Sequence, residues 1–251
     1  MYVLPYGQMS LWGLIVKPQM FSFYLIFFHF LFITPIYLNV KSKVSRLKGI
    51  YRIGPHNKDI ISIIFGSLLG DGHAEKRLIG VGTRISFYQE AVHVEYLLHL
   101  HKILSESGYC NTKIPNITTR LGIKGKLRKV VRFSTWTYTS FNWIHDLWYK
   151  DNIKCVPNCI NQYLTPLALA IWIMNDGAKV GNGLKFSTNS FSYNDCLLLI
   201  KALNDNFYIK ASVQSAGNKN QYVIYIWKES INDLRNIVSQ YIIPEMKYKL
   251  N

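Results

Sequence analysis

Acidic residues are scarce in this sequence of 251 residues. Asp and Glu number 14 against 29 Lys and Arg, which gives a formal charge of +15 at pH 7. Because 49% of the residues are hydrophobic and 14% are aromatic, the chain has the composition of a folded protein, not of a disordered basic tail. A folded chain this basic is attracted to polyanions, either nucleic acid or an anionic membrane surface. Composition leaves both partners open.

Cysteines are also few. The sequence has four, of which only Cys155 and Cys159 lie close together. A structural zinc site needs a second such pair or a pair of histidines at ligand spacing, and the seven histidines do not supply one. Buried free thiols in a reducing compartment fit this pattern better than a zinc centre.

A long uncharged apolar run occurs at residues 20–38 (MFSFYLIFFHFLFITPIYL), and basic residues follow from Lys41 onward. The run is long enough to span a bilayer. It differs from a secretory signal because it lacks a preceding basic region and a clear cleavage site of small residues. A membrane-spanning segment and a leader that is later removed both fit it.

One nonapeptide pattern occurs twice, at residues 64–72 (IFGSLLGDG) and 169–177 (LAIWIMNDG). Each copy predicts the end of a short apolar helix, followed by Asp and Gly. Thr165 and Pro166 predict the start of the second helix, as N-cap and first-turn proline. The glycines after the two aspartates, Gly72 and Gly177, fit left-handed helix caps.

The two aspartates, Asp71 and Asp176, stand where a carboxylate is unfavourable. The last turn of a helix exposes free carbonyls at the negative end of the helix dipole, so a carboxylate there calls for a bound cation. Two such ends side by side would gather carboxylate and carbonyl oxygens, which suit Mg²⁺. Gly66 and Gly70 share one helix face and would let a partner helix approach closely. A single copy would fit an ordinary buried helix capped by Asp-Gly, but the repeat favours the paired arrangement.

The elements after each nonapeptide also repeat. The run at residues 84–89 (RISFYQ) matches residues 184–189 (LKFSTN) at an offset of 100, each a strand that ends in an amide. Apolar helical patterns, later strands and closing helices follow in both halves. The helical patterns cover residues 96–104 and 197–203, the strands 129–137 and 221–228, and the closing helices 141–149 and 230–242.

The nonapeptides and this order of elements resemble the single-chain LAGLIDADG homing endonucleases over roughly residues 57–251. The most specific segments are residues 163–177 (YLTPLALAIWIMNDG) and 243–250 (IPEMKYKL), which are similar to the branch found in organellar introns. The resemblance implies an α+β fold of two pseudo-symmetric αββαββα repeats, residues 57–155 and 156–251. Their antiparallel sheets would form a saddle for double-stranded DNA. The chain is expected to be a monomer, because its halves differ in sequence.

The resemblance also implies site residues. Asp71 and Asp176 would bind Mg²⁺, with the carbonyls of Gly70 and Asn175 as further ligands, in a divalent-metal-dependent endodeoxyribonuclease. Ile171 stands where the family has a small packing residue, so we expect the helix contact to be asymmetric.

Four further residues are candidates for the site. The resemblance places Lys154 and Lys249 beside the metals, where a cation can offset phosphate charge or help to activate water; surface lysines would look the same in so basic a chain. Gln89 and Asn189 are either polar groups of the site or simply the last residues of strands.

The segment at residues 124–132 (KGKLRKVVR) packs five cations into nine residues at an expected hairpin. A β-ribbon can enter the major groove, where Arg and Lys contact guanine and other cations bind phosphates. A solvated loop is the alternative interpretation. The expected DNA-binding residues are Lys124, Lys126, Arg128, Lys129 and Arg132, with Lys185 and Lys219 in the second half.

Residues 4–13 (LPYGQMSLWG) resemble a piece of mitochondrial cytochrome b exon, and the likeness stops at Leu14. An exon fragment that runs into foreign sequence is typical of an intron reading frame fused to its upstream exon. Residues 1–56 would then be exon relic, apolar leader and basic linker, and the protein would be mitochondrial. The function expected is cleavage of the intronless allele, which drives intron homing.

Two other functions stay open. The first is an intron maturase, an RNA-binding splicing cofactor on the same fold, as the sole activity or beside cleavage; intact carboxylates favour the nuclease. The second is a membrane protein, which depends on residues 20–38 alone.

Overall fold

The computed structural model describes residues 47–76, 80–122 and 125–251. The exon-like stretch, the apolar run at residues 20–38 and Lys124 lie outside these residues. All the described residues belong to one compact unit. None of the helices in the described ranges combines the length and apolarity that a bilayer crossing requires.

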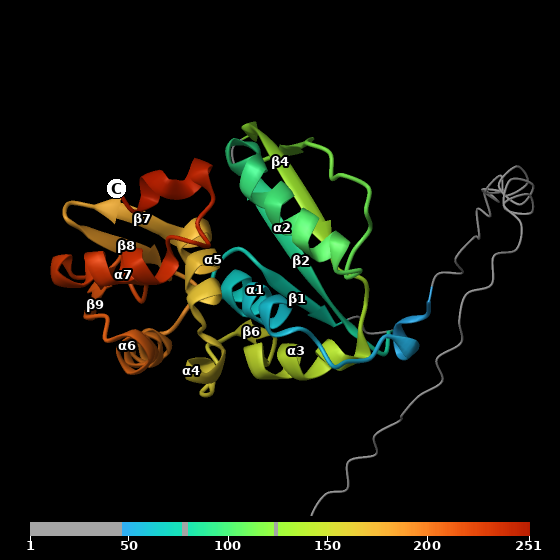
Figure 1. The fold of residues 1–251 in the computed structure, drawn as a ribbon, viewed down its shortest axis with the longest axis horizontal. Helices are drawn as coiled ribbons and strands as arrows, with labels where there is room; N and C mark the ends of the chain where they lie inside the picture. The colour runs from blue at the N-terminus through green and yellow to red at the C-terminus, as the bar shows by residue number, and fades with distance from the viewer. Residues whose placement is uncertain (1–46, 77–79, 123–124) are drawn as a thin grey trace, which may run out of the picture. The chain divides into compact units, whose positions relative to one another are not determined.

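Both halves follow the predicted αββαββα order (Figure 1). The first comprises α1 (Lys58–Leu69), β1 (His73–Lys76), β2 (Thr83–Glu90), α2 (Val94–Glu106), β3 (Thr118–Leu121), β4 (Leu127–Ser134) and α3 (Asn142–Trp148). The second comprises α5 (Pro166–Asp176), β7 (Gly177–Val180), β8 (Gly183–Ser187), α6 (Tyr193–Phe207), β9 (Ala211–Ser215), β10 (Tyr222–Ile226) and α7 (Ile231–Val238). The β5–β6 hairpin (Tyr149–Lys150 and Ile153–Lys154) and α4 (Ile160–Tyr163) connect them.

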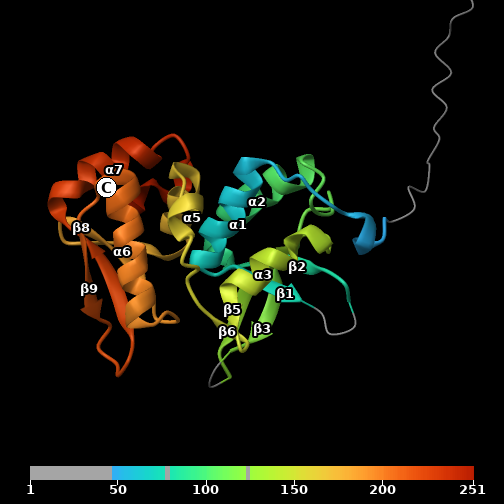
Figure 2. The same ribbon diagram turned by 90° about the horizontal axis from the view of Figure 1, so that it is seen from below.

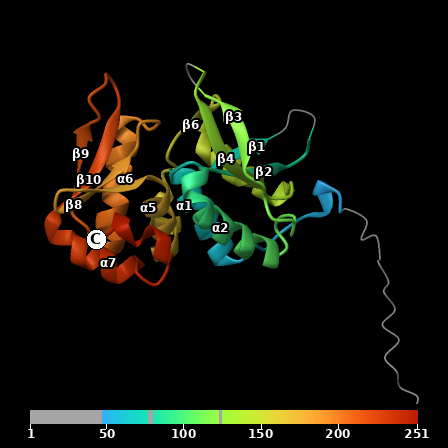
Figure 3. The ribbon, with the colours of Figure 1, turned by 90° about the horizontal axis from the view of Figure 1, so that it is seen from above.

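Each repeat builds an antiparallel sheet, and the two sheets have the same topology. In the described residues the strand orders are β1-β2-β4-β3 and β7-β8-β10-β9. The sheets lie on either side of the α1–α5 pair, and the β3–β4 and β9–β10 hairpins project to the same side of the molecule (Figures 2 and 3). The α+β fold of two pseudo-symmetric repeats is confirmed.

Helices α1 and α5 form the core between the two sheets. The Asn57 side chain caps α1 by accepting a hydrogen bond of 2.7 Å from the Asp59 N–H. The predicted start of α5 is confirmed. The Thr165 hydroxyl accepts a hydrogen bond of 3.1 Å from the Ala168 N–H, and Pro166 is the first helical residue. Nearly every later residue of both helices is buried, as expected for helices covered on all sides.

The two helices approach so closely that a side chain at Gly66 would not fit. A Cβ there would lie 2.4 Å from the Ala168 carbonyl oxygen and 2.8 Å from the Ile171 Cβ. Gly66 and Ile171 hold the same place in the two nonapeptides, so the small residue of one copy receives the large residue of the other. The expected asymmetry of the helix contact is confirmed.

The left-handed caps predicted at Gly72 and Gly177 are wrong. Neither glycine has a positive φ, and Gly177 is extended, with φ −73° and ψ 139°. The glycines are needed for a different reason, because the chain turns directly against the last helical turn. A Cβ on Gly72 would lie 2.6 Å from the Ser67 carbonyl oxygen, and one on Gly177 would lie 2.7 Å from that of Ile173.

The segment before α1, expected to be linker, packs against the first repeat. Arg52 Nη1 donates 3.1 Å to the Thr137 carbonyl. The His56 ring makes contacts of 2.9 Å with the Tyr109 hydroxyl and 2.8 Å with the Ser140 hydroxyl. These contacts explain why the compact unit begins upstream of residue 57.

Candidate active site

Asp71 and Asp176 lie at the neighbouring ends of α1 and α5. Asp71 follows α1 and is exposed, whereas Asp176 is the last residue of α5 and is half-buried. The ends meet closely, because a Cβ on Gly70 would lie 2.5 Å from the Asn175 Cβ. Burial and then the negative charge of Asp71 raise the pKa of Asp176 to about 7, although Lys154 and Lys249 oppose the shift. The two carboxylates therefore share one electrostatic site.

Lys154 is bound to the end of α1. Its Nζ donates hydrogen bonds to the Gly70 carbonyl, at 3.0 Å, and to the Gly72 carbonyl, at 2.9 Å. Burial lowers its pKa to about 8, while Asp176 and Asp71 act in the opposite direction. A cation at the negative end of the helix satisfies carbonyls that have no partner within the helix.

Lys249 makes the equivalent contact in the second repeat. Its Nζ donates to the carbonyls of Ile173 (3.3 Å), Met174 (2.6 Å) and Asn175 (3.0 Å). The residue is only 6% exposed, and burial lowers its pKa to about 8. Each lysine thus holds the carboxyl end of its own repeat's helix, beside the aspartate.

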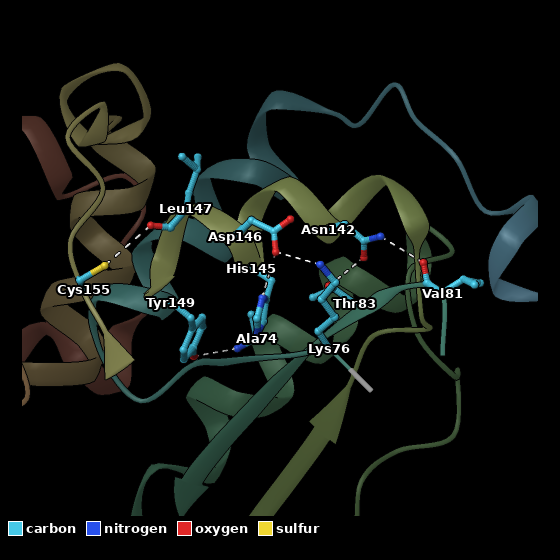
Figure 4. Close-up of polar contacts among 10 residues, drawn as sticks. All are labelled: Ala74, Lys76, Val81, Thr83, Asn142, His145, Asp146, Leu147, Tyr149 and Cys155. Carbon is cyan, nitrogen blue, oxygen red and sulfur yellow. Dashed lines mark hydrogen bonds and ion pairs between the residues drawn. The ribbon is translucent and has the colours of Figure 1, made fainter. Parts of the chain in front are cut away.

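The β5–β6 hairpin carries Lys154 to this position. Within it Tyr149 pairs with Lys154, and the Tyr149 hydroxyl accepts 3.2 Å from the Ala74 N–H in β1. Helix α3 is attached to the same sheet, because Lys76 and Asp146 form an ion pair of 2.9 Å (Figure 4). Cys155 also points back to α3, where its thiol contacts the Leu147 carbonyl.

Gln89 joins the two helix ends. It is 5% exposed, and its Nε2 donates 2.7 Å to Asp71 Oδ2 and 3.0 Å to Asn175 Oδ1. The amide thus contacts both repeats at once, next to one of the carboxylates.

Asn189 does not occupy the matching place. The cross-strand pair Ala74–Ile85 of the first repeat corresponds to the pair Lys179–Leu184 of the second. The offset between the strands β2 and β8 is therefore one residue smaller than the offset of 100 expected from the sequence. Thr188 is therefore the counterpart of Gln89. It is fully buried, and its hydroxyl donates 2.8 Å to the Tyr222 carbonyl, whereas Asn189 is exposed beyond β8.

Tyr96 is a site residue that the sequence interpretation missed. It is fully buried in α2, and its hydroxyl lies 3.4 Å from the Ile171 carbonyl. Burial first, and then the charges of Asp71 and Asp176, raise its pKa. It belongs to an apolar helical pattern, and only its hydroxyl could have indicated a polar environment.

Among the described residues no group of three or more His, Cys, Asp and Glu side chains gathers at one point. The oxygen atoms present nevertheless fit magnesium, because Mg²⁺ keeps several waters and takes one or two carboxylates together with substrate phosphates. The carbonyls of Gly70 and Asn175 already accept from the lysines, and each keeps a second lone pair.

The cationic cluster at residues 124–132 divides between two faces of the first sheet. Arg132 pairs with Tyr88, and Arg128 pairs with Arg120. These residues lie on the face of the sheet opposite to Phe87 and Val131, which belong to the core, and this is the face not covered by helices. Lys129 points to the helix-covered side, because successive strand residues alternate. Lys126 is exposed at the β3–β4 turn, Lys219 is exposed in the β9–β10 loop, and Lys185 lies on the open face of the second sheet, opposite Tyr225.

Residues 61–234 match the LAGLIDADG DNA endonuclease family. The chain is 56% identical to the cytochrome b mRNA maturase bI2 of Saccharomyces cerevisiae over 79% of its own length, which spans 48% of that protein. It is 47% identical to the Debaryomyces hansenii maturase of the same name, over 84% of this chain and 80% of that one.

A solved structure, the homing endonuclease I-WcaI bound to its DNA recognition sequence, is similar in fold. It superposes with a TM-score of 0.70 at 27% identity, over 78% of this chain and 87% of that one. The chain therefore belongs to the LAGLIDADG DNA endonuclease family.

Proposed function

We propose that this chain is a site-specific endonuclease that cuts both strands of a long DNA target in an intronless gene, and so drives intron homing. One observation carries the proposal: the paired helix ends bring together two carboxylates, each beside a lysine from its own repeat. Both halves of the site come from one chain, which supports action as a monomer.

Asp71 and Asp176 would hold Mg²⁺, with the carbonyls of Gly70 and Asn175 as further ligands. When bound, divalent ions make water nucleophilic and stabilise the leaving oxygen of a phosphodiester. Lys154 and Lys249 would offset the charge of the phosphate, since both amines are held beside the carboxylates. Gln89 would orient Asp71 through its 2.7 Å hydrogen bond.

The open faces of the two sheets would bind the duplex. Arginine and lysine side chains there can contact base edges in the major groove, and those of the hairpin loops can bind phosphates. The structural similarity to a DNA-bound homing endonuclease supports this placement.

The test uses intronless cytochrome b DNA. The exon-like stretch ends near Gly13, so the target should span the exon junction that lies just after the codons for Leu11, Trp12 and Gly13. With Mg²⁺ the full chain should cleave this DNA, and the intron-containing allele should stay intact because the intron splits the site. Cleavage of both alleles, or of neither, would overturn the proposed target.

A second candidate function is RNA maturation. Two relatives, at 56% and 47% identity, are named cytochrome b mRNA maturases, and the exon-like stretch supports a mitochondrial cytochrome b intron as the origin. Splicing of that intron RNA should be measured with the wild type and with the Asp71→Asn, Asp176→Asn double variant. Splicing that survives while cleavage is lost would establish a second activity.

A further inference from the structure

The two open faces of the sheets differ in chemistry. The first open face consists of the strand residues of the first sheet that lie on the same side of the sheet as Arg84. The second open face consists of the strand residues of the second sheet that lie on the same side as Lys185. Among the described strand residues, the first open face carries four arginines and the second carries one lysine as its only Lys or Arg. The arginines are Arg84, Arg120, Arg128 and Arg132.

Two of the arginines are held in place by glutamates on the same face. Arg84 donates to Glu75 through Nε at 2.9 Å and Nη2 at 2.6 Å, and Arg128 forms an ion pair with Glu90. In the major groove Arg binds the O6 and N7 of guanine, and Glu accepts from the N4 amine of cytosine. Both partners of each pair therefore suit a G·C base pair.

The other two arginines line a groove on this face. Arg120 lies over the Tyr88 ring, 5.9 Å from its centroid, and Arg132 is the cross-strand neighbour of Tyr88. The groove has a volume of about 460 Å³, and Arg84, Arg120 and Arg132 all contribute to its wall. Three guanidinium groups thus surround one hollow on the sheet.

The second open face is made mainly of hydroxyl, amide and apolar groups. Ser187 and Gln214 flank Val223, while Lys185 and Ser212 flank Tyr225. Gln binds the N6 and N7 of adenine, apolar side chains contact the thymine methyl, and Ser accepts either kind of base pair. Apart from Lys185, the side chains of this face suit A·T pairs.

We propose that the two repeats read half-sites of different composition: G·C pairs under the first open face and A·T pairs under the second. The proposal rests on the proposed function in one respect, that the chain binds duplex DNA across its sheets. Arg132, Arg120 and Gln214 are the specificity-determining residues it assigns.

The experiment is a binding selection from random duplex DNA with Mg²⁺ present. The full chain carries Asp71→Asn and Asp176→Asn so that bound DNA stays uncut. The selected sequences should form an asymmetric motif, with G·C pairs enriched in one half and A·T pairs in the other. Adding Arg132→Gln should weaken the guanine preference at one or two positions of the G·C half, by roughly tenfold.

Two further variants identify the halves. Gln214→Arg should create a new guanine preference in the A·T half alone. Lys102→Gln removes one positive charge from α2, on the helix-covered side, and should leave the motif unchanged. A motif that has the same composition in both halves, or that ignores Arg132→Gln and Gln214→Arg, would overturn the inference while leaving DNA binding intact. Failure to enrich any motif would overturn the proposed function itself.

Discussion

The Gln89 amide donates 2.7 Å to Asp71 Oδ2 and 3.0 Å to Asn175 Oδ1, so one side chain spans the boundary between the repeats. Gln89→Met would remove both bonds at nearly the same volume. We expect DNA cleavage to fall about 10- to 100-fold, the usual cost of losing a partner that orients a metal ligand, with DNA affinity preserved.

The matched control is its counterpart, Thr188→Val. The Thr188 hydroxyl donates to the Tyr222 carbonyl and to no aspartate, so this variant should lose about 1 kcal/mol of stability and keep its cleavage rate. Cleavage rates on linear target DNA, together with stabilities from urea unfolding, distinguish the two variants. Equal losses of cleavage in both variants would remove Gln89 from the site.

Asp71→Asn or Asp176→Asn should abolish double-strand cleavage. Each substitution removes a metal-binding carboxylate, and at the same time removes a negative charge that repels phosphate, so DNA affinity should be unchanged or higher. Gel shift and cleavage assays on the same duplex test this. Full cleavage by either variant would show that its aspartate holds no catalytic metal.

Stability of the metal-free protein should depend on pH through Asp176. Its pKa is raised to about 7 in the folded chain, against about 4 when unfolded, so folding favours the protonated form. The stabilising contribution is complete below about pH 4 and is lost as pH rises towards about 7.

Asp176→Asn cannot ionise and therefore escapes this loss. In EDTA the variant should be more stable than the wild type at about pH 8 and equal to it at about pH 4. Urea unfolding midpoints at both pH values provide the measurement. A difference that is the same at both pH values would mean that ionisation of Asp176 is not its cause.

Gly66→Ala should destabilise the protein by about 3 kcal/mol, the upper end of the cost of overpacking. The new Cβ would meet the Ala168 carbonyl oxygen at 2.4 Å, and backbone cannot easily move. Gly217→Ala is the control, since it has open space but a φ of +88° and should cost about 1 kcal/mol. Denaturant midpoints that fall equally for both variants would contradict the close helix contact.

Affinity for duplex DNA should fall steeply as salt concentration rises, because bound cations release counterions from phosphates. Lys126 and Lys219 are both exposed in hairpin loops. Replacing either one with alanine should reduce the slope of log affinity against log salt concentration by about one. Lys102→Ala, on the outside of α2, should leave the slope unchanged. An affinity that does not depend on salt would argue against a nucleic-acid partner.

The sequence predicted the repeat, the order of elements and the position of the two aspartates at the helix ends, because helix periodicity and the Asp-Gly ending survive in both copies. It was insufficient for register. The second repeat has a tight β7–β8 turn where the first has a longer loop, so matching strands by composition misplaced Asn189 by one residue. A shift of one residue in a strand exchanges the two faces of the sheet. The expected counterpart of the buried Gln89 was therefore an exposed residue, Asn189, in place of the buried Thr188.

The same limit applies to the cluster at residues 124–132. Five neighbouring cations indicated a polyanion partner, yet adjacent residues such as Arg128 and Lys129 point to opposite faces. Which side of a strand faces helices depends on contacts made far away in the sequence. Lys249 was placed beside the site only by its resemblance to a motif, since nothing local predicts a lysine bound to three carbonyls.

The contact between Gly66 and Ile171 also bears on which halves can pair. A dimer of two second repeats would force isoleucine against isoleucine, at a position where the two helices of this chain leave room for only one large side chain. The second repeat is therefore not self-complementary here, and the shape of the interface discriminates against pairing of two second repeats. Recombining halves from related proteins would require exchanging both positions together.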